Sequence, residues 1–224
     1  MGFLDRPVTK SANPTSKFLE WKSDDKCFSY YDKENKTNVK IPLPLQFIVL
    51  EEYHTVKGFS DADQTGIYSN EVLQISAEEM EVKTFKGRVI AKGIYNEIKQ
   101  NVNAGGGTYH KSMYVIDENG NLVNISFKGA VVSKWSKFTE KGQFKRLKSE
   151  WVKIETVEEH QKGKVKYTTP NFEFSKKITQ KDIDLIMPKV EEFTEYMKNY
   201  FDNGSANNIE VKDVSDEDVD DLPF

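Results

Sequence analysis

Positively charged and aromatic side chains are interleaved along much of this chain, a combination that suits the binding of single-stranded nucleic acid. Lysine and arginine neutralise phosphates, and exposed rings stack on unpaired bases, each stack contributing about 1–3 kcal/mol. Cations concentrate in the stretches 83–92, 134–148 and 162–166. The residues that we expect to contact a strand are Trp21, Tyr30, Lys86, Arg88, Lys92, Tyr95, His110, Tyr114, Trp151 and Lys153.

The alternation of side chains along extended segments predicts which of these residues point away from the core. Lys86 and Arg88 fall opposite their apolar neighbours in a segment with a period of two. His110 and Tyr114 share a face opposite another apolar pair, so we expect both of them to look outward. Trp135 lies on the apolar face of a predicted helix, and we assign it to the core.

The segment 210–224 is acidic and cannot build a packed core. It contains seven acids and one lysine, and it ends in Leu-Pro-Phe. Such a composition favours a solvated, disordered tail that remains available as a ligand. Its acids suit a basic rim, and a ring beside a carboxylate suits an apolar pocket with a cationic edge. The residues that we expect to bind a partner protein are Asp218, Asp220, Asp221, Leu222, Pro223 and Phe224.

This tail resembles the acidic Asp-Asp-x-Pro-Phe tips of bacterial single-stranded DNA-binding proteins, with residues 220–224 in the corresponding places. In that family the tip recruits replication and repair enzymes, and the acidic stretch competes with DNA for the basic groove. The whole chain resembles a bacteriophage-encoded single-stranded DNA-binding protein. The resemblance implies sequence-independent binding of single-stranded DNA during replication, recombination and repair, with a polymerase, helicase, primase or nuclease as the partner of the tail.

The resemblance is specific in the tail and general over residues 18–175. The barrel segment does not follow the bacterial sequence pattern, and the linker before the tail is only a few residues long. Homotetramer formation therefore does not carry over, and we expect a monomer or a small homo-oligomer. A short linker also predicts an intramolecular competition, because it raises the effective concentration of the tail at the groove.

Two other functions are compatible with the sequence. The chain fits a replisome interaction adaptor without nucleic-acid activity, in which the folded part is a scaffold for the tail. Glu81 and Lys83, preceded by Asp61 and Asp63, have the Asp…Glu-x-Lys order of a magnesium-dependent nuclease, although these residue types are common. Residues 61–72 imitate the start of a calcium-binding loop but lack an acid at its twelfth position. We expect no enzyme activity, no metal and no cofactor.

Composition predicts a soluble globular protein. Hydrophobic residues make up 37% of the 224 residues and aromatic residues 12%, which is enough for a core. The net charge of −4 hides a mildly basic body, because the tail carries −6 and leaves the rest at +2. Lone Cys27 excludes an internal disulfide, and three histidines add no zinc ligand set. With neither a signal peptide nor a membrane span in the sequence, we expect a cytoplasmic protein without membrane contact.

The order of the predicted elements indicates a mainly β protein built on an OB-fold-like five-stranded barrel. Residues 18–41 form an aromatic N-terminal β-meander that extends the sheet or covers an edge. Residues 58–71 are expected to form a polar loop, and the Gly-rich residues 103–108 a flexible link. The predicted barrel comprises strands over 45–56 and 80–95, a hairpin over 109–127, an internal helix over 127–140 and two strands over 150–174.

A second helix is predicted near the C-terminus. Thr179 is placed as its N-cap with an acid three residues later, and Pro188 is expected to kink or split it. The predicted division of the chain is an N-terminal arm (1–17), an OB-fold-like nucleic-acid-binding domain (18–178), a C-terminal helical segment (179–202) and a flexible linker with the acidic tail (203–224).

Overall fold

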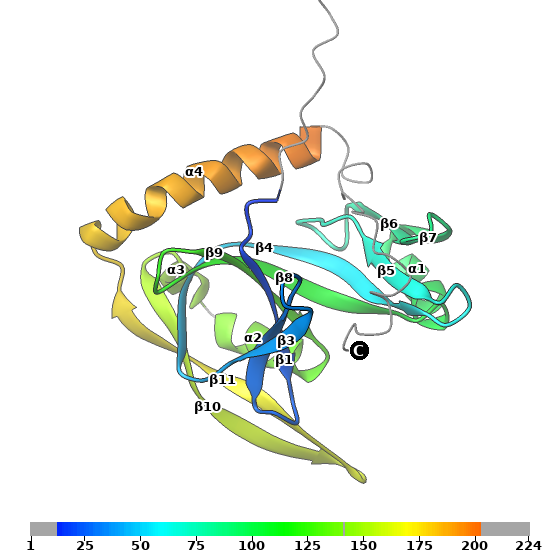
Figure 1. Ribbon diagram of the computed structural model, residues 1–224, viewed down its shortest axis with the longest axis horizontal. Helices are drawn as coiled ribbons and strands as arrows, with labels where there is room; N and C mark the ends of the chain where they lie inside the picture. The colour runs from blue at the N-terminus through cyan, green and yellow to red at the C-terminus, as the bar shows by residue number, and fades with distance from the viewer. Residues whose placement is uncertain (1–12, 141, 203–224) are drawn as a thin grey trace, which may run out of the picture.

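The structure is a computed structural model that describes residues 13–140 and 142–202. Most of the predicted N-terminal arm, the linker and the whole acidic tail lie outside these residues. The described chain is mainly β, with a mixed sheet of eleven strands and four helices. Figure 1 shows α4 crossing one side of the sheet, and the β5–β7 region and the β10–β11 hairpin at different ends of the molecule.

The strands are β1 (Lys17–Lys22), β2 (Cys27–Asp32), β3 (Thr37–Ile41), β4 (Leu45–Ser60), β5 (Thr65–Ser69), β6 (Glu79–Thr84), β7 (Val89–Ile94), β8 (Gly107–Asp117), β9 (Leu122–Lys128), β10 (Glu150–Lys162) and β11 (Val165–Lys177). The helices are α1 (Tyr95–Ala104), α2 (Ala130–Thr139), α3 (Phe144–Leu147) and α4 (Gln180–Asp202).

The strands follow the order β3-β2-β1-β9-β8-β4-β5-β6-β7, and β10 pairs with both β4 and β11. The N-terminal meander is confirmed, and it extends the sheet because β1 pairs in parallel with β9. The predicted β8–β9 hairpin, the long β4 strand and the two strands β10 and β11 are also confirmed. The sheet does not close on itself, so the mainly β class is established while the five-stranded barrel is not.

The sequence predictions were wrong in the region between β4 and β8. The segment expected as a polar loop forms the end of β4 and all of β5, which pair as a hairpin. Residues 80–95 were expected as one strand, but they form the hairpin β6–β7, in which Gly87 has a φ of +88°. Only glycine adopts this backbone conformation without strain, so Gly87 ends the strand at this point.

Helix α1 was not predicted, because the glycines after it favoured a flexible link. Its buried residues Ile98 and Val102 are four positions apart, which places them on one helical face. They pack with Val56, Ile67 and Met80 in a small separate core. The i, i+4 spacing of Ile98 and Val102 is the signal in the sequence that indicates this helix.

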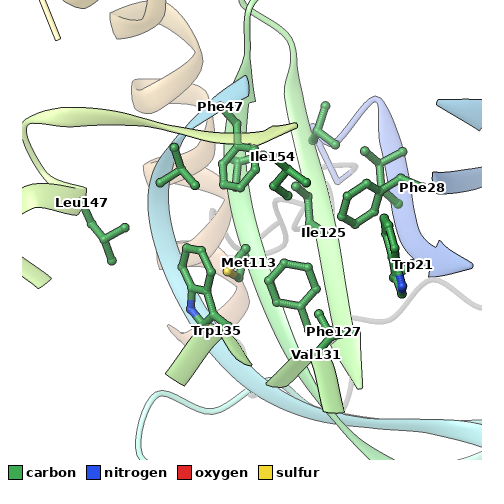
Figure 2. Packing of buried hydrophobic residues seen from close by; sticks show 14 residues of the cluster. Trp21, Phe28, Phe47, Met113, Ile125, Phe127, Val131, Trp135, Leu147 and Ile154 are labelled. Carbon is green, nitrogen blue, oxygen red and sulfur yellow. The ribbon is translucent and has the colours of Figure 1, made fainter. Parts of the chain in front are cut away.

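The main core lies between the sheet and α2, as Figure 2 shows. Trp135 of α2 is fully buried, as predicted, and its ring centroid lies 5.7 Å from that of Phe127 and 4.9 Å from that of Phe172. Its indole Nε1 donates a hydrogen bond to Glu52 Oε1 at 2.9 Å. The one polar atom of the indole therefore has a hydrogen-bond partner although the ring is buried.

Helix α4 packs on the other face of the sheet and builds a second core. Its buried residues Ile186, Phe193 and Met197 contact a cluster that includes Tyr114 and Leu122. The helix continues through Pro188, so the proline does not split it. One apolar stripe in the sequence is therefore enough to bind the whole helix to the sheet.

The predicted N-cap of α4 is confirmed by its hydrogen bonds. Asp182 Oδ2 accepts from Thr179 N at 2.8 Å and from Thr179 Oγ1 at 2.7 Å. We expect Thr179→Ala to lower the free energy of unfolding by about 1 kcal/mol, because the helix start loses its capping side chain. Urea denaturation of this variant measures the effect, with Thr179→Ser as the control that keeps the hydroxyl. Equal stability of the alanine variant and the native protein would contradict the assignment of the cap.

Candidate nucleic-acid interface

Three rings that were expected to stack on bases are buried, so the expectation that they are available was wrong. Trp21 is 9% exposed, and Trp151 and Tyr114 are each 3% exposed. The indole Nε1 of Trp21 donates to the carbonyl of Thr168 at 2.9 Å. Large rings are the usual filling of a core, and here that preference outweighs their stacking chemistry.

His110 and Tyr114 lie on the predicted side of β8 but are not exposed there. They sit opposite Met113, as strand alternation requires, yet His110 is only 4% exposed. The Tyr114 ring centroid is 4.7 Å from that of Phe193, so α4 covers it. The prediction that both look outward was wrong, because this sheet carries buried residues on both faces.

Lys86 and Arg88 are exposed, but both interact with Asp63. The guanidinium Nε of Arg88 donates to Asp63 Oδ2 at 2.7 Å, and Lys86 Nζ donates to the Asp63 carbonyl at 2.9 Å. The guanidinium of Arg88 lowers the pKa of the Asp63 carboxyl. These cations therefore join the β4–β5 turn to the β6–β7 turn, a structural role that leaves less charge for a phosphate.

The remaining predicted contact residues are dispersed over the molecule. Lys92 is exposed on β7, and half-buried Tyr95 begins α1. Tyr30 is half-buried against the main core. Lys153 pairs with Glu155 at 2.6 Å. Because β7 and β10 occupy different ends of the molecule (Figure 1), these residues do not form one surface.

Polar side chains gather instead on the face of β4, β8, β9 and β1 that lies opposite the main core, most of them buried. Side chains paired across neighbouring strands share a face of the sheet. The register aligns Thr55, His110 and Lys128 in one row and Ser112, Ser126 and Glu20 in the next. We call this region the polar sheet face and define it by Lys57, His110, Ser112, Asn124, Ser126, Lys128, Glu20 and Phe18.

The floor of the polar sheet face is a buried network of hydrogen bonds. His110 Nδ1 and Ser126 Oγ are 2.8 Å apart, and Asn124 Nδ2 donates to Ser112 Oγ at 2.7 Å. Asn124 Oδ1, and Ser29 Oγ on β2, are buried and have no hydrogen-bond partner among the described residues. A buried acceptor in this situation has capacity for a water molecule or a ligand group.

Lysines on two strands make the rim of the polar sheet face positive. Burial, together with Lys57 and Lys128, lowers the pKa of His110 to about 3, so its imidazole is neutral near pH 7. Lys128 is exposed, and Lys57 is half-buried with a pKa lowered chiefly by burial. The Glu20 carboxylate opposes this lowering for Lys57 and is the acid of the same face.

Glu71 connects the polar sheet face to α4. Its carboxylate accepts a hydrogen bond from the Tyr114 hydroxyl at 2.9 Å, and its backbone N–H donates to the Tyr200 hydroxyl at 2.8 Å. Burial raises the pKa of Glu71, whereas Ser112, Tyr114 and Lys57 lower it. Glu71 thus joins β8 to α4 through these two hydrogen bonds.

Phe18 provides an accessible ring on the polar sheet face. Its side chain is 48% exposed, and its position on β1 is paired with Asn124 of β9. The polar sheet face therefore combines an exposed ring, an exposed ammonium group at Lys128 and a half-buried one at Lys57. Such a combination can stack on a base and neutralise the adjoining phosphates.

Lys57, Lys128 and Phe18 were not among the predicted contact residues, because each lies near or beyond an end of its predicted strand. Lys57 follows the predicted end of β4, and Lys128 is the last residue of β9. They meet only through the pairing of β4, β8 and β9, and a sequence without this register does not reveal it. No local signal in the sequence relates these residues to His110, because they lie on other strands.

Neither a metal site nor a membrane-spanning helix is found in the part of the chain that the structure describes. No group of three or more His, Cys, Asp or Glu side chains there is arranged to hold a metal ion. Glu81 of the nuclease-like pattern pairs with Lys83 at 2.7 Å, and Asp63 pairs with Arg88. None of the helices described is long and apolar enough to cross a membrane.

Comparisons of the chain with protein-family models, with curated proteins and with solved structures find no match.

Proposed function

We propose that this protein binds single-stranded DNA without sequence preference and recruits replication proteins through its acidic tail. The observation that supports the proposal is the polar sheet face, on which Lys57 and Lys128 lie on the same side of the sheet as the exposed ring of Phe18. Phosphates of a strand contact the two ammonium groups, and a base stacks on Phe18. The buried hydrogen bonds of His110 and Asn124 hold the strands that position these groups.

The order of the strands supports the proposal that the domain is related to an OB-fold. Strands β4, β8, β9, β10 and β11 occur in this order, with β5, β6, β7 and α1 inserted between β4 and β8 and with α2 and α3 between β9 and β10. Strand β4 pairs with β10 as a barrel requires. Strand β1 pairs with β9, and its Trp21 donates a hydrogen bond to Thr168 of β11. In this arrangement β1 occupies the place where the barrel would otherwise close.

The acidic tail is the part of the chain to which we assign the recruitment of replication proteins. Residues 210–224 lie outside the described residues, and residues 220–224 resemble the bacterial tips in sequence. We propose that the tail competes with DNA for the polar sheet face and docks on a phage or host replication enzyme when DNA displaces it. This role belongs in the cytoplasm, where phage DNA is replicated and recombined.

A titration with labelled oligonucleotides tests the DNA-binding function. Fluorescence anisotropy of single-stranded, double-stranded and RNA oligomers, each at low and high salt, should show the highest affinity for single-stranded DNA. The affinity should fall steeply with salt, because binding releases the counterions of the phosphates. Absence of binding to every single-stranded oligomer at low salt would contradict the proposal.

Removal of residues 210–224 is predicted to increase the affinity for single-stranded DNA several-fold, most visibly at low salt. The truncation removes seven acids that compete with phosphates for the same lysines. The matched control replaces the Leu-Pro-Phe end by alanines and keeps the acids, so that affinity for DNA stays while binding to a partner is lost. Equal affinity with and without the tail would exclude the competition.

The adaptor without nucleic-acid activity is the second candidate, and one observation favours it. Several cations predicted to bind DNA are engaged in ion pairs, among them Arg88 with Asp63 and Lys153 with Glu155. In an adaptor these pairs are simply the surface of a scaffold. The same oligonucleotide titration separates the two functions, since the adaptor binds none of the oligomers.

A further inference from the structure

A second basic surface with aromatic rings lies on the β10–β11 hairpin and α2. Lys134 of α2 forms an ion pair with Glu158 of β10, which brings the helix against the hairpin. Lys134, Lys137 and His160 all lower the pKa of the Glu158 carboxyl, so these groups surround it. We call this region the arm surface and define it by Lys134, Lys137, Glu158, His160, Lys162 and Tyr167.

The rings of the arm surface form a flat pair at the end of the hairpin. His160 and Tyr167 are paired across β10 and β11, and their rings are stacked with centroids 4.9 Å apart and planes 19° apart. His160 Nε2 and Thr169 Oγ1 are 2.8 Å apart, which fixes the orientation of the imidazole. Exposed Lys162 belongs to the next pair on the same face of the hairpin.

The charge of this surface is not balanced by acids. Glu158 is the one acid among the six residues that define it, against three lysines. Lys134 pairs with Glu158, and His160 Nδ1 lies 4.0 Å from Glu158 Oε1. Exposed Lys137 and Lys162 form no ion pair among the described residues and are available to an anion. A flat ring pair flanked by such lysines has the chemistry of a site for an unpaired nucleotide strand.

The arm surface and the polar sheet face lie on different sides of the molecule. The arm surface adjoins α2, whose Val131 and Trp135 are buried in the main core. The polar sheet face looks away from that core. The opposite face of the hairpin, with Glu159 and Thr168, contacts the β1–β2 turn at Lys26 and Ser23. A strand seated on one surface therefore leaves the other one open.

We propose that the protein holds two segments of single-stranded DNA at once, one on the polar sheet face and one on the arm surface. This bridging activity rests on the proposed function and adds a second binding site to it. Two strands bound by one molecule are kept close together, so their effective concentration rises and complementary strands pair faster.

Energy transfer between two labelled oligomers tests the bridging. The full-length protein is mixed with dT oligomers of about ten nucleotides that carry either a donor or an acceptor dye. We expect energy transfer in the native protein and its loss in the triple variant Lys137→Gln, Lys162→Gln and Tyr167→Ala. The variant should keep native affinity for a single oligomer. The control Lys99→Gln with Lys181→Gln, which removes exposed charges on α1 and α4, should keep the energy transfer.

The outcomes separate this inference from the proposed function. Binding of one oligomer without energy transfer in the native protein overturns the bridging and leaves the single-strand binding intact. Energy transfer that persists in the triple variant also overturns it, because the two strands are then joined without the arm surface. Absence of any oligomer binding removes the proposed function itself. Circular dichroism of the variant confirms that the exposed hairpin end and its sheet remain folded.

Discussion

Replacing Lys57 and Lys128 together by glutamine should lower the affinity for single-stranded DNA about 100-fold, because each lost contact between an ammonium group and a phosphate removes about 1.5 kcal/mol. Both lysines lie on the polar sheet face, on either side of His110 in the strand order. The slope of log affinity against log salt should also decrease by about 1.4, since two fewer phosphates are neutralised. Anisotropy titrations at several salt concentrations measure both quantities.

Two control variants make this prediction sharper. Lys99→Gln with Lys181→Gln removes the same charge from exposed helix positions and should leave the affinity and the salt slope close to native values. Lys86→Gln with Arg88→Gln tests the original sequence prediction, because Asp63 already holds these cations. A loss of affinity in this last variant, with native affinity in the Lys57 and Lys128 variant, would move the binding surface to the β6–β7 turn.

The stability of the protein should decrease by about 2 kcal/mol between pH 8 and pH 5 through His110 alone. Burial, together with Lys57 and Lys128, lowers the pKa of this imidazole from its ordinary 6.5 to about 3 in the folded protein. Between these values the unfolded chain binds a proton that the folded protein does not bind. The contribution of His110 to the free energy of unfolding therefore has its full value above pH 6.5, and it decreases as the pH falls toward 3.

Urea denaturation at a series of pH values from 8 to 5 measures this effect. His110→Gln should flatten the pH dependence, because glutamine takes up no proton and still offers an amide to Ser126. His160→Gln is the matched control, since it replaces a more accessible histidine by the same residue. The same pH dependence in the native protein and in His110→Gln would contradict a buried neutral imidazole. Glu71 affects stability in the opposite direction, because its raised pKa lets the folded protein take up a proton more readily than the unfolded chain does as the pH falls. It therefore offsets part of the effect of His110.

Most strands could be predicted from the sequence because their signal is local. The alternation in 109–127, the turn at 117–121 and the apolar run of β4 each define an element without reference to the rest of the chain. The helix α2 and the N-cap of α4 are local in the same sense. The β6–β7 hairpin was missed because Lys86 and Gly87 continue the alternation through a turn. Helix α1 was missed because the glycines that follow it favoured a flexible link.

The site was harder to predict, because it depends on which strands are neighbours. Alternation placed His110 and Tyr114 correctly relative to Met113, but only the packing of α4 shows that Tyr114 is covered. Ion pairs between distant segments, such as Arg88 with Asp63, are equally invisible in a sequence. The sequence shows the three cationic stretches, but the positions of their charges on the surface depend on the fold.

Acetylation of lysines, with and without a saturating dT oligomer and read by mass spectrometry, tests the polar sheet face most directly. We predict that Lys57 and Lys128 react less when the oligomer is bound, whereas Lys86, Lys99 and Lys181 react as in the free protein. Unchanged reactivity of Lys128 in a saturated complex, or protection confined to Lys86, would contradict binding of DNA to this face.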